Sequence, residues 1–313
     1  MPGRISKWLN RPEYIYQPGK LLRRLRGKGS RQEGDQVINL PWKLPIEVDS
    51  SETIGRILSH HGIFEMPVVE AIFRLVDPGD LVLDAGANIG YMAAVAAAAG
   101  ARKVISFEPH PILFTRLERN VTRWNEDARF AGRFEARKEA VSSEKGSATL
   151  FIPKMGFAEN QGLASLEAQA DQGAHHQVQV SANTVDAVIL NSGGSVGVLK
   201  IDIEGHEFHA FKGATVSLRE KKIRDIIYEG FEGADSEASK LLMGYGYSIY
   251  GLQCSIFGPV LSDRLSGGRR HIGDHNLVAT LDPSRIRKRM SGMGFKCLSR
   301  AARSGRLAEK AAR

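Results

Sequence analysis

The sequence has little cysteine and no long apolar run. Its 313 residues include two cysteines, Cys254 and Cys297, too few for a disulfide framework or a cysteine metal cluster. No apolar stretch approaches the roughly 18 residues of a membrane-spanning helix, and no apolar segment of a secretory signal follows Met1. These absences favour a globular protein of a reducing compartment. We therefore expect a cytoplasmic chain, with the inner membrane face as a place of peripheral contact.

Acidic residues are scarce at both ends of the chain. Residues 1–30 carry a net charge of +7 and residues 282–313 a net charge of +8, whereas residues 31–281 carry −7. Basic ends suit an anionic partner such as membrane lipid, a phosphorylated substrate or nucleic acid, although a tail that only aids solubility has the same composition. We predict a basic extension and linker over 1–60, a folded domain over 61–281 and a basic tail over 282–313.

A glycine turn after a short buried strand is the most informative stretch. Residues 81–83 form an apolar run typical of a strand covered on both faces, and the alanine-rich residues 92–99 favour a helix. Between them, Gly86 and Gly90 permit positive φ and close backbone approach. A strand that feeds a helix through glycines presents free backbone N–H groups to a ligand.

The next strand indicates which ligand this turn binds. Glu108 ends that strand and stands 22 positions after Gly86, near the spacing of an acid that holds a ribose hydroxyl. A dinucleotide fingerprint would need glycines where Asn88 and Tyr91 stand, and Asp84 would repel a pyrophosphate. The residues therefore favour a cationic nucleoside, S-adenosylmethionine, over NAD(P); a turn without a ligand is the remaining alternative.

Two carboxylates and an imidazole follow a second buried strand. Asp202 and Glu204 are two residues apart, so an extended backbone points both side chains the same way. Gly205 lets the chain turn, and His206 then starts a helix. We predict a functional role for Asp202, Glu204 and His206; the alternatives are an Asp202 that caps a turn and a solvated His206.

Strand and helix patterns alternate along the chain. Helices are predicted over 20–26, 52–59 (capped by Ser50 or Ser51), 66–76, 92–99, 111–124 and 206–213. Strands are predicted over 81–83, 103–107, 133–141, 147–152, 177–181, 196–202, 223–229, 247–252 and 276–280, with a linker or edge strand over 36–48. This alternation predicts an α/β fold with a doubly wound, mostly parallel sheet and a late antiparallel hairpin.

Several short motifs occur in order along residues 60–281. They are Leu83-Asp84-Ala85-Gly86-Ala87-Asn88-Ile89-Gly90-Tyr91, Phe107-Glu108-Pro109-His110-Pro111 with Leu117 and Asn120-Val121, Ala140-Val141-Ser142, Thr184-Val185-Asp186, Leu199-Lys200-Ile201-Asp202-Ile203-Glu204-Gly205-His206-Glu207 with Gly213, and Ile227-Tyr228-Glu229. In these motifs the chain resembles the FkbM-family methyltransferases. Val185 is a mild departure, because leucine is more usual before that aspartate.

The resemblance implies a class I methyltransferase, Rossmann-like fold and S-adenosylmethionine as the methyl donor. It implies methylation of a hydroxyl, commonly on a sugar or a secondary metabolite. Among glycan acceptors, a lipid-linked one presented at a membrane would explain the basic ends of the chain. By position, the donor site would comprise Asp84, Gly86, Asn88 and Gly90 at the methionine end, Glu108 at the ribose, and Glu139, Ala140 and Val141 beside adenine. Our hypothesis is that Asp202, Glu204 or His206 supplies a general base or holds the acceptor.

Three alternatives stay open. The first is a divalent metal ion: no metal site is predicted, but two carboxylates with an imidazole could hold such an ion. A basic tail could bind RNA without sequence preference, but the chain lacks the Asn-Pro-Pro-aromatic motif of amino-methylating enzymes, and neither cysteine follows a proline. The third alternative is an NAD(P)-binding or non-catalytic Rossmann-like protein. The substituted glycine positions argue against NAD(P) binding, and the acidic cluster argues against a non-catalytic protein.

Overall fold

A computed structural model describes residues 34–153, 161–167, 175–192, 194–230, 232–263, 275–299 and 302. The helix predicted over 20–26 lies outside these residues, as does the end of the predicted basic tail. In the part of the chain that is described, no helix combines the length and the apolar character needed to cross a bilayer.

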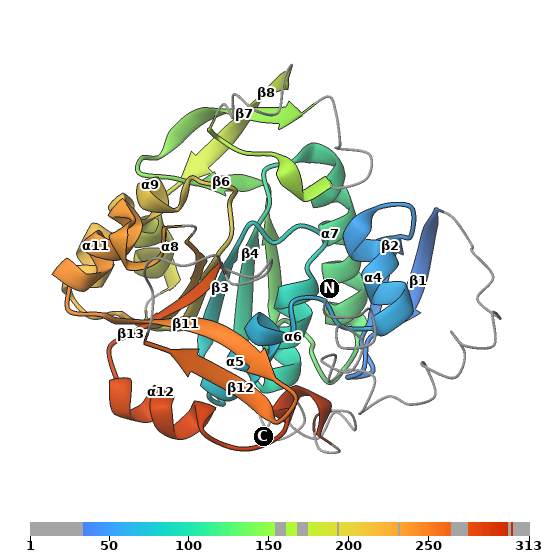
Figure 1. The fold of residues 1–313 in the computed structure, drawn as a ribbon. Helices are drawn as coiled ribbons and strands as arrows, with labels where there is room; N and C mark the ends of the chain where they lie inside the picture. The colour runs from blue at the N-terminus through green and yellow to red at the C-terminus, as the bar shows by residue number, and fades with distance from the viewer. Residues whose placement is uncertain are drawn as a thin grey trace, which may run out of the picture.

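Eight strands form the central sheet in the order β12-β11-β13-β10-β9-β3-β4-β5 (Figure 1). They are β3 (Leu81–Ala85), β4 (Lys103–Phe107), β5 (Phe134–Arg137), β9 (Val196–Ile201), β10 (Ile223–Glu229), β11 (Ser248–Ser255), β12 (Gly258–Ser262) and β13 (Asn276–Thr280). The strands from β5 to β10 run parallel, and β13 is antiparallel to both β10 and β11. This confirms the predicted doubly wound sheet with a late antiparallel pair; the edge strand β12 was not predicted.

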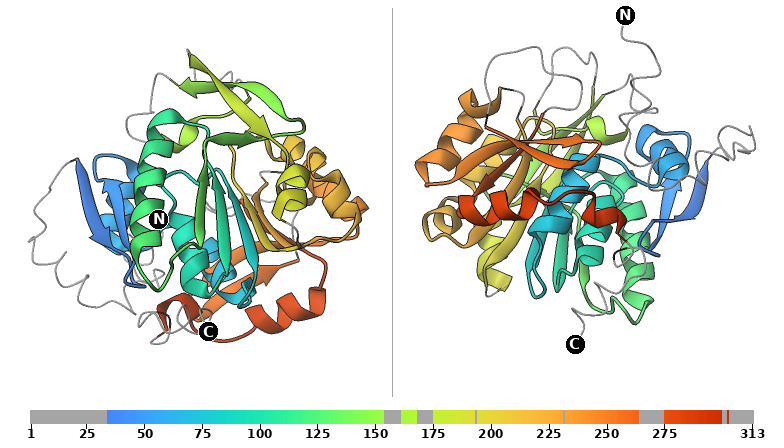
Figure 2. Two further views of the ribbon diagram at one scale, coloured as in Figure 1. Left: turned by 180° about the vertical axis from the view of Figure 1, so that it is seen from behind. Right: turned by 60° about the horizontal axis from the view of Figure 1, so that its bottom comes forward.

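Helices cover both faces of this sheet, because alternate side chains of each strand point to opposite cores. One face carries α5 (Met66–Leu75), α6 (Tyr91–Ala99), α7 (Pro111–Glu126) and α12 (Pro283–Met290), and the other carries α8 (Val185–Ser192), α9 (Glu207–Lys212), α10 (Thr215–Arg219) and α11 (Glu237–Gly244) (Figure 2). Short 3₁₀ turns are η1 (Gln161–Leu163), η3 (Gly233–Asp235) and η4 (Lys296–Leu298). The small alanine side chains let α6 lie buried along its whole length.

The single strand predicted over 133–141 is wrong. β5 ends at Arg137, and β6 (Glu139–Val141) leaves the central sheet to pair in parallel with β8 (His175–Asn183). β7 (Gly146–Pro153) lies antiparallel on the other side of β8, and Figure 1 shows this small sheet above the carboxyl ends of the central strands. Both pieces share one alternating pattern, so only the choice of pairing partner reveals the break.

The predicted cap of α4 (Thr53–His61) is also wrong. The N-cap residue is Glu52, with an extended backbone, and not Ser50 or Ser51. The Glu52 carboxylate accepts hydrogen bonds from N–H groups of the first turn, among them that of Ile54 at 2.9 Å. A carboxylate at this position also meets the positive end of the helix dipole.

Both ends of the described chain pack on the same helical face. A hairpin of β1 (Asp35–Asn39) and β2 (Pro45–Asp49) places Trp42 in the core, where its indole N–H donates to the carbonyl of Cys297 at 2.8 Å. The Glu70 carboxylate on α5 accepts from the N–H of Cys297 at 2.9 Å. Residues of the predicted linker and of the predicted tail therefore contribute to the folded body.

Candidate active site

A cavity of about 270 Å³ opens at the carboxyl ends of β3, β4, β9 and β10. The chain order reverses between β3 and β9, and open parallel sheets bind ligands at such a switch point. Nine of the predicted site residues line this cavity: Gly86, Asn88, Glu108, Glu139, Ala140, Val141, Asp202, Glu204 and His206. The fold therefore brings the glycine turn and the acidic motif together.

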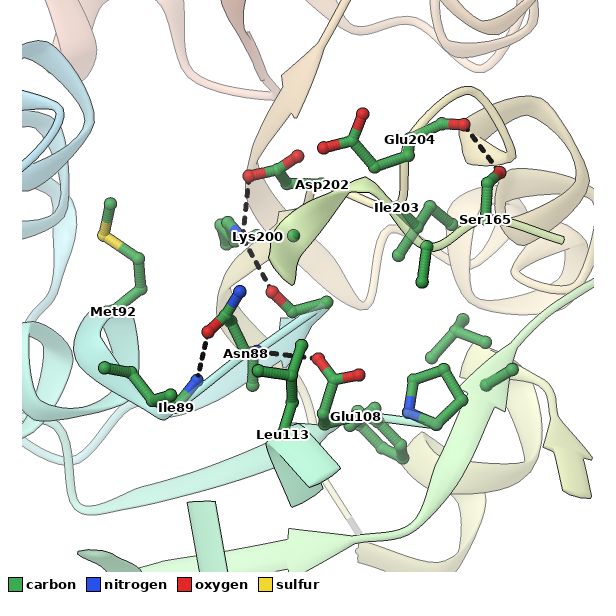
Figure 3. A pocket seen from close by; sticks show the side chains of 18 of the residues that line it. Asn88, Ile89, Met92, Glu108, Leu113, Ser165, Lys200, Asp202, Ile203 and Glu204 are labelled. Carbon is green, nitrogen blue, oxygen red and sulfur yellow. Dashed lines mark hydrogen bonds and ion pairs between the residues drawn. The ribbon is translucent and has the colours of Figure 1, made fainter. Parts of the chain in front are cut away.

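The glycine turn after β3 results from the close approach of two strand ends. Gly86 has a φ of +73°, and a Cβ there would lie 1.8 Å from the carbonyl oxygen of Asp202, so no larger residue fits. Asn88 also has a left-handed backbone, with a φ of 52°, which asparagine tolerates better than most residues. Its side-chain oxygen accepts from the N–H of Ile89 at 2.8 Å (Figure 3). The turn thus joins the two predicted motifs at one point.

Asp84 and Gly90 support the turn from behind. Asp84 is 1% exposed, and the Lys200 ammonium lies 3.7 Å from its Oδ1. A Cβ on Gly90 would lie 2.8 Å from Leu117 Cδ1, so glycine lets α7 pack against the start of α6. Among the described residues, those that line the cavity do not include Asp84 or Gly90. Their predicted place at the methionine end of a donor stays a prediction.

Glu108 faces the cavity from the end of β4. Its carboxylate accepts from the backbone N–H of Asn88 at 2.8 Å (Figure 3) and from that of His110 at 2.9 Å. Burial raises the pKa of Glu108 to about 7, against the lowering effect of these two donors. Because a carboxylate oxygen has two lone pairs, each oxygen keeps one that can accept a hydrogen bond from a ligand hydroxyl.

Lys200 is a buried cation beside the cavity and was not predicted as a site residue. Its ammonium lies 3.2 Å from Asp202 Oδ2 and 3.3 Å from the carbonyl oxygen of Gly86 (Figure 3). Burial opposes the charge, but three nearby carboxylates, chiefly Asp202, raise the pKa of Lys200 above its usual range. A lysine in the apolar run of β9 was the sequence signal for this ion pair.

Two more carboxylates line the cavity, and neither was predicted. Glu65 precedes α5 with a φ of 49°, and Glu229 ends β10. Burial, reinforced by the nearby Asp202, raises the pKa of Glu65 to about 7 and that of Glu229 to about 8. Its place at the end of a buried strand was a signal for Glu229, whereas no local pattern marks Glu65. The cavity is therefore rich in carboxylates and suits a cationic ligand.

Glu204 lines the cavity and has a strained backbone conformation. Its φ of 55° lies in the left-handed region, which costs a non-glycine residue free energy and is common at functional sites. Its carbonyl oxygen accepts from Ser165 Oγ at 2.7 Å (Figure 3). Burial, and then the neighbouring Asp202 and Glu207, raises the pKa of Glu204 to about 7. This carboxyl group therefore exchanges a proton near neutral pH.

His206 is held at both nitrogens of its ring. Nε2 lies 2.9 Å from Ser142 Oγ, and Nδ1 lies 2.7 Å from Glu167 Oε1. Burial lowers the pKa of His206, and the Glu167 carboxylate opposes this effect. With both ring nitrogens bonded inside the protein, His206 is suited to holding its loop in place rather than to accepting a proton from a ligand.

We predict that Glu167→Gln lowers the pKa of His206 further, because it removes the negative charge that opposes the effect of burial. NMR titration of the imidazole resonances measures this change. His110, whose pKa is lowered to about 4 by burial, serves as the internal control and should keep its pKa. An unchanged or raised pKa of His206 would mean that Glu167 does not hold this ring in solution.

A metal ion held by Asp202, Glu204 and His206 was the alternative from the sequence, and the geometry does not favour it. Among the described residues, the potential metal-ligand atoms that lie within 4.8 Å of one another belong to Glu167, His206 and His209. The Glu167–His206 distance is that of a hydrogen bond. Asp202 and Glu204 therefore stand outside that cluster.

Comparison with known proteins identifies the family of this chain. The family model of the methyltransferase FkbM domain matches residues 84–249. The chain is 28% identical over 204 residues to the hexuronic acid methyltransferase AglP of Haloferax volcanii, covering 62% of this chain and 74% of that protein. It is 30% identical over 207 residues to the 31-O-demethyl-FK506 methyltransferase FkbM of Streptomyces tacrolimicus, covering 58% and 77% respectively.

A solved structure is also similar. The methyltransferase FkbM of Methylobacillus flagellatus KT aligns at 19% identity with a TM-score of 0.41, over 64% of this chain and 44% of that chain. This chain thus spans less than half of that structure. The family model covers more than half of the present chain and contains both motifs that meet at the cavity. The chain therefore belongs to the FkbM family of methyltransferases.

Proposed function

We propose that this chain is an S-adenosylmethionine-dependent O-methyltransferase that modifies a hydroxyl of a sugar, a glycan or a secondary metabolite. The observation that carries the proposal is the cavity between the glycine turn and the loop at 202–207, with Glu108 at one side and Glu204 at the other. The names of the two relatives support the acceptor class, since one specifies a hexuronic acid and the other a demethylated FK506.

The donor fits the side of the cavity next to the glycine turn. Glu108 would accept hydrogen bonds from the ribose hydroxyls, and residues 139–141 would border the adenine. S-Adenosylmethionine supplies a methyl group on a positively charged sulfonium. The carboxylates of Asp202, Glu204 and Glu229 favour that cation and disfavour the pyrophosphate of NAD(P), which is the alternative cofactor.

Glu204 is our candidate for the general base. Asp202 is paired with the Lys200 ammonium at 3.2 Å, and both ring nitrogens of His206 are bonded within the protein. Glu204 lines the cavity, and its pKa of about 7 allows it to take a proton at neutral pH and return it to water.

The proposed step is a direct displacement. Glu204 would take the proton of the acceptor hydroxyl, and the hydroxyl oxygen would bond to the methyl carbon that S-adenosylmethionine supplies, which would leave the electron pair of the methyl–sulfur bond on the sulfur. Alignment of the two reactants is worth up to roughly 7–11 kcal/mol of the barrier. A positioned base typically adds a factor of roughly 10²–10⁴. The rigid turn at Gly86 and the ion pair of Lys200 with Asp202 would supply the alignment.

An RNA acceptor is the less supported alternative, because arginines of the predicted basic tail already have partners. The Arg285 guanidinium contacts Asp225 at 2.7 Å and Asp77 at 2.8 Å, and Arg289 is also paired with Asp77. These ion pairs hold α12 on the body and leave fewer cations for phosphates.

Two measurements test the proposed function. Titration calorimetry should show micromolar binding of S-adenosylhomocysteine and no binding of NAD. Transfer of a labelled methyl group should then be detected on hydroxyl acceptors, tested with neutral hexosides, hexuronic acids and polyketide alcohols. Binding of NAD alone would contradict the donor assignment, and methylation of RNA with no hydroxyl acceptor among these compounds would contradict the acceptor assignment.

A further inference from the structure

Exposed apolar side chains gather at the tip of the β11–β12 hairpin. Ile256 and Phe257 form the turn between these strands and are 39% and 64% exposed, and Val260 on β12 is 40% exposed. Met293, in the turn that follows α12, is 84% exposed. Single exposed apolar residues are ordinary, but a group of them marks an interaction site. We call these four residues the tip surface.

The two segments of the tip surface are in backbone contact. The N–H of Gly294 donates to the carbonyl oxygen of Phe257 at 2.7 Å. A Cβ on Gly258 would lie 2.9 Å from the carbonyl oxygen of Gly294, so glycine lets the hairpin lie directly against the turn. Figure 1 shows β12 and α12 along one edge of the molecule. The hairpin turn and the turn that carries Met293 therefore lie side by side.

The turn that carries Met293 is anchored to the core. The Arg74 guanidinium donates to the carbonyl oxygens of Gly292 at 2.9 Å and Gly294 at 2.8 Å, and Arg74 is paired with the buried Glu70. Met293 is thus held out on a fixed backbone. Because this backbone is already fixed, the binding of a partner costs little backbone entropy here.

Positive charge lies beside the tip surface. Lys288 on α12 and Lys296 on η4 are exposed, and the half-exposed Arg287 is paired with Asp263 at 2.8 Å. In the sequence, residues 256–313 contain thirteen Lys and Arg against four Asp and Glu, a net charge of +9 that exceeds the +8 of the whole chain. In the sequence, the exposed apolar group therefore lies in a basic segment.

We propose that the tip surface docks this protein on an anionic lipid bilayer. Apolar side chains that enter the headgroup boundary and cations that face anionic lipid are the two contributions that hold peripheral proteins on membranes. A second copy of the chain suits the surface less well, because two such basic regions would repel each other. The inference goes beyond the proposed methyl transfer and does not depend on it.

Flotation of the full-length chain with phospholipid vesicles tests the docking. We expect binding to mixed phosphatidylcholine and phosphatidylglycerol vesicles, much weaker binding to phosphatidylcholine alone, and release by salt.

Phe257→Asp with Met293→Asp should weaken binding about tenfold or more, because two apolar groups are lost from the contact. Lys288→Glu with Lys296→Glu should also weaken it. Leu190→Asp, at a side chain 76% exposed on α8 of the opposite face, is the matched control and should bind like the wild type.

Circular dichroism and melting temperature establish that each variant is folded, and Phe257→Ser with Met293→Ser is the milder pair. Binding of S-adenosylhomocysteine should be unchanged in all of them. Vesicle binding by the double aspartate variant at the wild-type level would overturn the proposal. A dimer of the wild type, seen by light scattering without lipid and lost in that variant, would overturn it in favour of a second copy. RNA binding lost in that variant, with no vesicle binding by the wild type, would overturn it in favour of nucleic acid.

Discussion

Glu108→Ala should weaken the binding of S-adenosylhomocysteine by about 100-fold or more. Hydrogen bonds to a charged group are worth roughly 1.5–3 kcal/mol each, and a ribose presents two hydroxyls to this carboxylate. Because roughly 1.4 kcal/mol corresponds to a factor of ten in affinity, the loss of both bonds gives this magnitude. Titration calorimetry on the wild type and the variant measures it, and unchanged affinity would contradict the placement of the ribose.

A second substitution separates ligand contact from support of the turn. Glu108→Ala also leaves the N–H groups of Asn88 and His110 without their carboxylate partner. Glu108→Gln keeps an amide oxygen for one of them, and it should still bind the ligand weakly because its oxygen is uncharged. Glu118→Gln, on the exposed side of α7, is the surface control and should bind like the wild type.

The raised pKa of Glu108 gives this affinity a pH dependence. Its carboxyl group has a pKa of about 7 in the free protein, and only the ionised form offers both oxygens as acceptors. Affinity should therefore fall as the pH drops below about 7 and level off above it. This limb of the pH profile should be absent in Glu108→Gln.

Glu204→Gln should lower kcat by roughly 10²–10⁴-fold while the affinity for S-adenosylhomocysteine stays within about threefold of the wild type. The amide cannot accept the proton of the acceptor hydroxyl, but the donor side of the cavity is unchanged. At saturating donor and acceptor, wild-type kcat should rise with pH as Glu204 ionises in the complex with both ligands. The variant should lack this rise.

Glu229→Gln is the matched control for Glu204, because Glu229 is a second carboxyl group of raised pKa in the same cavity. It should keep most of the turnover. Turnover lost in Glu229→Gln but kept in Glu204→Gln would assign the base to Glu229. If Asp202, Glu204 and His206 can all be replaced with turnover intact, the role predicted for this motif is wrong.

The glycine turn and the place of Glu108 beside it were predictable because their signals are local. The turn at Gly86 and Asn88 is encoded by residues that accept a left-handed backbone. The position of Glu108 follows from the length of one strand–helix–strand unit, since parallel strands place their carboxyl ends at one edge. Lys200 lies within one of the two motifs, but the sequence does not reveal its ion pair with Asp84 or its contact with Gly86, because both of these residues come from another strand and its turn.

Other features depended on contacts between distant residues. Trp42 donates to the carbonyl of Cys297, 255 positions away, and this contact draws the segments predicted as linker and tail into the body. The break between β5 and β6 leaves no trace in the alternation of side chains, because either sheet accepts the same pattern. Glu65 reaches the cavity from the loop before α5, where no motif marks it.

By itself, the sequence determined most strands of the central sheet, the glycine turn and the chemical types of the two motifs. These properties follow from backbone preferences and side-chain periodicity, which act between neighbours in the chain. The tertiary structure decided which carboxyl groups share the cavity, and it pairs Asp202 with Lys200 and the His206 imidazole with Ser142 and Glu167. Such pairings depend on sheet register and packing, and burial then raises the pKa of Glu204 and of Glu229. Ion pairing and burial of this kind arise only in the assembled fold, so they cannot be deduced from any single segment of the chain.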